Sequence, residues 1–161
     1  KNHFKLVSQI CKPLLSSPKT AQRIYNGELM NRTNNPLERM AIIHLVFEPA
    51  ALAFLGFFHQ RGHELIEDLN WSMQVKESFR EILQDEVGHV YSGTDYIKNL
   101  LKLSSKSDIA ITKQAMKRHR AFIIKGVKEM FKTSTKSKEF LKPMISRFNW
   151  YYAKASEGVF A

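Results

Sequence analysis

The stretch IIHLVFEPAALAFLGFF, residues 42–58, carries apolar side chains on every side of what reads as one helix. A surface helix has a single apolar stripe, whereas a helix that is apolar all round belongs at the centre of a bundle. The stretch also contains His44, Glu48 and Pro49, while a membrane span needs about 20 apolar residues with few or no charges. It therefore predicts a buried core helix over about residues 37–58 and no transmembrane segment.

Three more long helices are predicted after the core helix. In each of them apolar residues recur at the 3.6-residue period of an α-helix. The predicted ranges are about 70–103, 109–131 and 139–160. The polar turns SSKSD (104–108) and KTSTKSK (132–138) separate these helices, and Ser107 is the predicted N-cap of the middle one. No strand pattern, internal repeat or domain linker appears in the sequence.

The whole chain, residues 1–161, is predicted to form one all-α domain. Two shorter helices are expected within residues 1–34, and the Asn-rich NRTNNP (31–36) separates them from the core helix. Long helices joined by short connections pack as antiparallel neighbours. We therefore predict an up-down four-helix bundle over residues 37–160, with the two extra N-terminal helices packed against it.

The charge is strongly positive and unevenly distributed. The chain has 25 Lys and Arg against 15 Asp and Glu, a net charge of +10, and the positive excess lies between Lys98 and Lys154. A basic half of this kind would attract an acidic partner, either an acidic protein or a nucleic acid; the alternative is a solvated basic face that keeps the protein soluble. No recognised nucleic-acid-binding motif accompanies the charge. A second copy of the chain, forming a homodimer, is a further candidate partner.

The single cysteine, Cys11, cannot form a disulfide within the chain, which favours the cytoplasm or another reducing compartment. It follows Leu6 and Ile10 in an apolar pattern, so its predicted role is packing.

Glu48 is the unexpected residue of the core helix. An unpaired buried carboxylate is costly, so Glu48 must be paired, protonated or bound to something. Pro49 beside it removes a backbone donor and is expected to kink the helix. His44 lies one turn earlier, and its role is left open between a plain core histidine, a hydrogen-bond partner of Glu48 and a ligand.

The next helix places a second carboxylate and an imidazole on one face. In LQDEVGHVYSG (83–93), Glu86 and His89 are three residues apart, so their side chains are neighbours on a helix. In an antiparallel hairpin, residues equidistant from the turn lie opposite each other. The midpoint between Glu48 and this pair falls near residue 68, inside the predicted connector, so the three side chains are predicted to meet.

A Glu on one helix followed by D-E-x-x-H on the next resembles the ferritin-like di-iron carboxylate superfamily, through Glu48 and through residues 85–89. That fold uses a Glu from each of two helices and a Glu-x-x-His from each of the other two. The resemblance covers about residues 37–160. It implies an Fe cofactor of one or two ions, with Mn or Zn as alternatives, and an oxidoreductase acting on a small or carrier-bound substrate.

The second half of the sequence departs from this signature. Where the third helix should supply a Glu, residues 119–126 offer His119, and near residue 147 the fourth helix lacks the second Glu-x-x-His. A single metal ion remains chemically sensible. The predicted ligands are Glu48, Glu86, His89 and His119, and the predicted supporting residues are His44, Asp85 and Tyr152.

A non-catalytic helical scaffold or binding protein is the alternative interpretation. Its metal site would be degenerate, with Arg118, Arg147 or a Lys turned inward to pair with the carboxylates. Its basic face would bind the acidic partner. Iron storage ranks last, because its oxidation centre needs the carboxylates that are missing from the second half.

Overall fold

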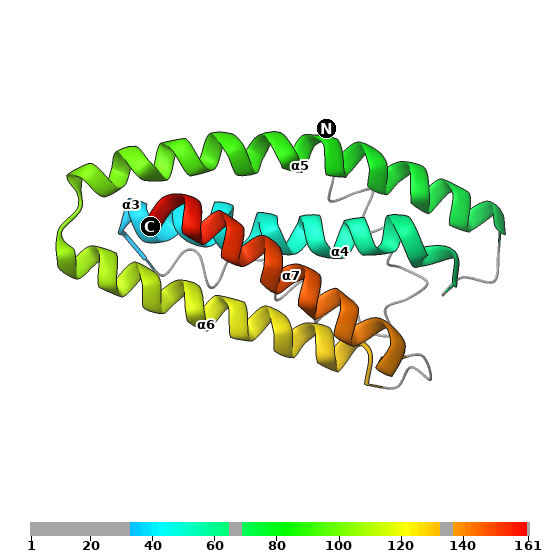
Figure 1. Ribbon diagram of the computed structural model, residues 1–161. Coiled ribbons are helices and arrows are strands. Elements are labelled where there is room, and N and C mark those ends of the chain that lie inside the picture. The colour runs from blue at the N-terminus through cyan, green and yellow to red at the C-terminus, as the bar shows by residue number, and fades with distance from the viewer. Residues whose placement is uncertain (1–32, 65–68, 133–136, 161) are drawn as a thin grey trace.

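The computed structural model describes residues 33–64, 69–132 and 137–160, and every regular element in these ranges is helical (Figure 1). The core helix consists of α3 (Pro36–Ile42), the π-helical η1 (Ile43–Phe47) and α4 (Glu48–Arg61), followed by the 3-10 turn η2 (Gly62–Glu64). The other helices are α5 (Leu69–Leu103), α6 (Lys106–Met130) and α7 (Ser137–Phe160). The predicted all-α class is confirmed for this part of the chain. The two predicted N-terminal helices lie outside the described residues.

The continuous helix α3–η1–α4 lies at the centre of the fold. Helix α5 packs along its whole length, α6 packs mainly on α3, and α7 packs mainly on α4 (Figure 1). The central helix therefore needs apolar side chains on all sides, and five of its residues are completely buried, namely Ala41, Ile42, Leu45, Val46 and Ala53. This arrangement is compatible with a four-helix bundle.

Pro36–Glu64 is long and apolar enough to cross a membrane when judged by length and composition alone. The core helix of a folded bundle meets the same criterion, and 56% of the most apolar window is buried inside this fold. Among the described residues it is the one helix of this kind. Its apolar side chains pack against α5, α6 and α7, as predicted for a core helix.

The apolar stripes of the outer helices face the central helix. Phe79, Ile82 and Ile97 of α5 are at most 4% exposed. In α7, Phe140 and Phe148 are completely buried. Their rings lie 5.5 Å from the ring of Phe57 and 5.7 Å from the ring of Phe54, respectively. The 3.6-residue repeats therefore identified the buried faces correctly.

The disruption expected at Pro49 takes the form of a π-helical turn. Proline has no backbone N–H, so the carbonyl of Leu45 cannot receive the usual bond from four residues later. The N–H of Glu48 reaches the carbonyl of Ile43, five residues earlier. Short π-helical segments are frequent at functional sites, and this one leads directly into Glu48.

The N-cap of α6 differs from the predicted N-cap by two residues. Its N-cap is Ser105, not Ser107, because Ser105 has Asp108 three residues later and the two form a capping box. The N–H of Asp108 donates to Ser105 Oγ at 3.1 Å, and the N–H of Ser105 donates to the Asp108 carboxylate at 3.3 Å. At the end of α4, Gly62 is the C-cap residue and has a right-handed φ of -59°, so the chain continues into η2.

We expect Ser105→Ala to lower the free energy of unfolding by about 1 kcal/mol, because the first turn of α6 loses its cap. Ser107→Ala is the matched control. Ser107 is exposed inside the helix, where alanine is the better helix former, so its substitution should be neutral or slightly stabilising. Urea denaturation followed by circular dichroism measures both. Equal losses in the two variants would contradict the capping assignment.

Candidate metal centre

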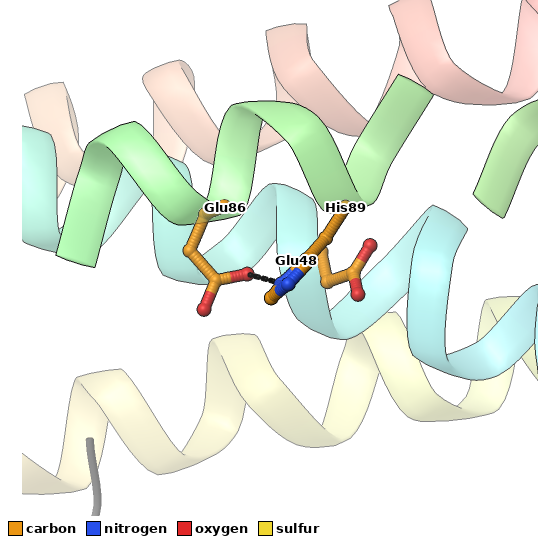
Figure 2. Close-up of side chains that lie close together, drawn as sticks. All are labelled: Glu48, Glu86 and His89. Carbon is orange, nitrogen blue, oxygen red and sulfur yellow. Dashed lines mark hydrogen bonds and ion pairs between the residues drawn. The ribbon is translucent and has the colours of Figure 1, made fainter. Parts of the chain in front are cut away.

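Three side chains that could bind a metal ion meet between α4 and α5. Glu48 is the first residue of α4, and Glu86 and His89 lie on adjacent turns of α5 (Figure 2). Each offers one ligand atom, and these atoms all lie within 4.8 Å of one another. The meeting of Glu48 with the Glu86–His89 pair is what the equal distances from the connector predict.

The spacing of these atoms suits a common ion. Oε2 of Glu86 and Nδ1 of His89 are 3.4 Å apart (Figure 2). Two ligands bound to one ion at about 2.1 Å are separated by about 3.0–3.4 Å in octahedral or tetrahedral geometry. The pair on α5 therefore already has this separation, and a small side-chain movement would bring Glu48 to it.

The two carboxylates are largely buried, whereas the imidazole is open. The side chains of Glu48 and Glu86 are 12% and 14% exposed, and that of His89 is 53% exposed. Two carboxylates with oxygens within 4.8 Å of each other repel by an energy on the order of 3 kcal/mol at an effective dielectric constant of about 20. A cation between them would remove this repulsion, and the exposed side of His89 would leave the site accessible to a small molecule.

His44 of η1 is the hydrogen-bond partner of Glu48. Its Nδ1 lies 2.7 Å from Oε2 of Glu48, and the His44 side chain is 16% exposed. An ionised carboxylate only accepts hydrogen bonds, so Nδ1 carries the hydrogen and donates it. Of the roles left open for His44, the structure shows the hydrogen-bonding one. Such a bond fixes the orientation of a ligating carboxylate.

His119 of α6 is buried against Phe47, the residue before Glu48, and is outside the three-residue group. It is 7% exposed, and its ring meets the Phe47 ring edge-on at 6.1 Å between centroids. Its Nδ1 donates to the carbonyl of Ala115 at 2.9 Å, and Nε2 has no partner within the described ranges. A carbonyl-bound Nδ1 with a free Nε2 is the form in which histidines ligate metals. Ligation by His119 stays a prediction.

On the third and fourth helices, from which the resemblance expects further ligands, Arg120 contacts Asn149 and Tyr152. Arg120 of α6 donates to Oδ1 of Asn149 at 3.2 and 2.9 Å, and its guanidinium lies 5.3 Å from the ring of Tyr152. The Tyr152 ring also lies 6.2 Å from that of Phe148. The contact of Tyr152 with Arg120 therefore links α7 to α6. Asp85, the other predicted supporting residue, is exposed on α5.

The arginines that the scaffold interpretation turns inward have other surroundings. Arg147 donates to Oε1 of Gln60 at 2.7 Å, and its guanidinium lies over Gly56. Arg118 is exposed. The carboxylate of Glu48, which the scaffold interpretation pairs with a cationic side chain such as an arginine, is hydrogen-bonded to His44.

Gly93 is the residue near the site whose importance the sequence did not reveal. It is buried in α5, one turn after His89, and His44 packs directly against it. The available signal was a glycine within an apolar helical stripe, which indicates a close approach of another element.

Comparisons of the chain with protein-family models, with curated proteins and with solved structures find no match. The candidate metal centre therefore rests on the geometry and the chemistry of Glu48, Glu86 and His89.

Proposed function

We propose that this chain is a ferritin-like up-down helical bundle that binds one divalent transition-metal ion through Glu48, Glu86 and His89. The observation that carries the proposal is the meeting of two carboxylates and one imidazole, from two helices, within 4.8 Å. The bound ion would serve an oxidoreductase activity on a small or carrier-bound substrate, as the resemblance to the ferritin-like superfamily implies.

The residues present fit iron, manganese or zinc. Carboxylate and imidazole ligands suit all three metals, and two carboxylates balance the charge of a divalent ion. With an open coordination position such an ion polarises a bound molecule, and iron or manganese adds redox chemistry. The protein holds the carboxylates in place, with His44 orienting Glu48, and leaves the His89 side open for entry. His119 is the candidate fourth ligand.

One ion fits the described residues better than two. A di-iron centre needs carboxylates from all four helices. Arg120, Asn149 and Tyr152 link the third and fourth helices, and none of these three residues supplies a carboxylate.

The test is metal retention by the purified protein after anaerobic loading with Fe(II) and removal of free metal. We expect about one equivalent in the wild type and less than about a tenth in the double variant Glu86→Ala, His89→Ala, because two of three ligands are gone. His63→Ala is the control, since His63 is an exposed histidine of η2, outside the three-residue group. Plasma mass spectrometry measures the metal.

Less than about a tenth of an equivalent in the wild type would overturn the proposal. Equal retention by the wild type and the double variant would place the ion elsewhere in the chain.

The exposed cations of α6 favour a second candidate, a scaffold that binds an acidic protein or a nucleic acid. The exposed basic residues of this helix include Lys106, Lys113, Lys117, Arg118, Lys125 and Lys128. Binding dominated by such charges weakens steeply with salt. This candidate takes first place if the wild type retains no metal.

A further inference from the structure

Gly93 is the point of closest approach between α5 and the π-helical segment. A Cβ atom at Gly93 would lie 2.1 Å from Cγ, 2.3 Å from Nδ1 and 2.6 Å from Cβ of His44. Contacts this short do not occur in real structures. The clash reaches the base of the His44 side chain, so a rotation of the imidazole alone cannot relieve it. Any larger residue at position 93 must displace His44.

Displacement of His44 would move its Nδ1 atom, which is hydrogen-bonded to the carboxylate of Glu48. Nδ1 of His44 donates to Oε2 of Glu48 at 2.7 Å, in surroundings that leave only 16% and 12% of the two side chains exposed. Gly93 leaves room for His44, and His44 fixes one oxygen of a carboxylate in the three-residue group. These contacts connect position 93 with a candidate ligand on another helix.

We propose that Gly93 and His44 are positioning residues for Glu48 and set the metal affinity of the centre. This inference rests on the proposed function. The other helical glycines of α5 and α6 do not share this constraint, because a Cβ at Gly88 or Gly126 would meet nothing within 4 Å. Gly88 lies five residues before Gly93 on the same helix and is exposed, so it provides the matched control.

The experiment measures the dissociation constant of Mn(II) by electron paramagnetic resonance for the wild type and variants of the full chain. We expect Gly93→Ala and His44→Ala each to weaken binding about 10- to 100-fold, the usual loss when the partner of a ligand is removed. Gly88→Ala should bind as the wild type does. His44→Asn, which keeps a donor near the position of Nδ1, should bind about fivefold more tightly than His44→Ala.

The double variant His44→Gly, Gly93→Ala shows whether Gly93 acts through His44. Glycine at position 44 removes the Cβ atom that alanine would keep 2.6 Å from the new methyl group, so we expect the double variant to bind as His44→Gly alone does. It also supplies a folded protein with alanine at position 93 if Gly93→Ala does not fold. Losses that multiply in the double variant would overturn the inference.

Two further outcomes separate this inference from the function on which it rests. If the wild type does not bind Mn(II), the proposed function and the inference both fail. If the wild type binds Mn(II), and Gly93→Ala and His44→Ala bind it as tightly as Gly88→Ala does, only the inference fails.

Discussion

Replacement of Glu48 with glutamine is expected to weaken metal binding more than about 100-fold without unfolding the protein. Changes to the partners of ligands already weaken binding about 10- to 100-fold, and here a charged ligand is itself removed. In the wild type, His44 Nδ1 lies 2.7 Å from the Glu48 carboxylate. The amide oxygen of glutamine can accept the same hydrogen bond from Nδ1. Titration with Mn(II) measures the change in affinity.

The metal-free Glu48→Gln protein should be as stable as the wild type or slightly more stable. The substitution removes one of two carboxylates that lie within 4.8 Å of each other and are mostly buried. Glu157→Gln is the matched control, because Glu157 is an exposed residue of α7 that pairs with Lys154 on the surface. Unchanged affinity in Glu48→Gln would remove Glu48 from the ligands, and loss of the fold would make its role structural.

Phe148→Ala is expected to have the largest effect on stability, with a loss of about 3–5 kcal/mol in the free energy of unfolding. Phe148 is completely buried, and its ring packs against that of Phe54 in the central helix. Domains of ordinary stability have about 5–15 kcal/mol in total, so this one change removes a large share. Urea denaturation followed by circular dichroism gives the value.

Trp150→Ala, two residues further along α7, is the control for Phe148→Ala. The Trp150 side chain is 58% exposed, and its ring contacts that of its neighbour Tyr151. Its removal should cost less than about 1 kcal/mol, although tryptophan is the larger residue. Similar losses in the two variants would mean that α7 does not present this face to α4.

The central helix and the meeting of Glu48 with Glu86 and His89 could be predicted because they depend on simple repeats. Burial is non-directional, so a helix that is apolar all round must lie in the middle. The rise per residue of a helix is constant, so equal distances from the connector placed Glu48 opposite Glu86 and His89. Neither argument needs knowledge of how individual side chains pack.

The details around the site could not be predicted in this way. The contact between Gly93 and His44 depends on the distance between two helices and on one side-chain rotamer. The cluster of Arg120, Asn149 and Tyr152 depends on the rotation of α6 and α7 about their axes, which tertiary packing sets. Periodicity gives the buried face of a helix but not these rotations.

The predicted N-cap of α6, Ser107, was wrong for a local reason. Two serines two residues apart are both good N-cap residues, and the sequence prediction weighed only the type of residue. The deciding feature is the residue three positions later, which is Asp108 for Ser105 and Ala110 for Ser107. The capping-box pattern was present in the sequence and would have given the correct start of the helix.

The central claim is that Glu48, Glu86 and His89 bind one metal ion. Its most direct test is an anomalous difference map, recorded at the iron absorption edge, from crystals of protein loaded anaerobically with Fe(II). We predict a single peak about 2.0–2.3 Å from a carboxylate oxygen of Glu48, a carboxylate oxygen of Glu86 and Nδ1 of His89. The absence of a peak between these three side chains, or a peak bound only by other residues, would contradict the claim.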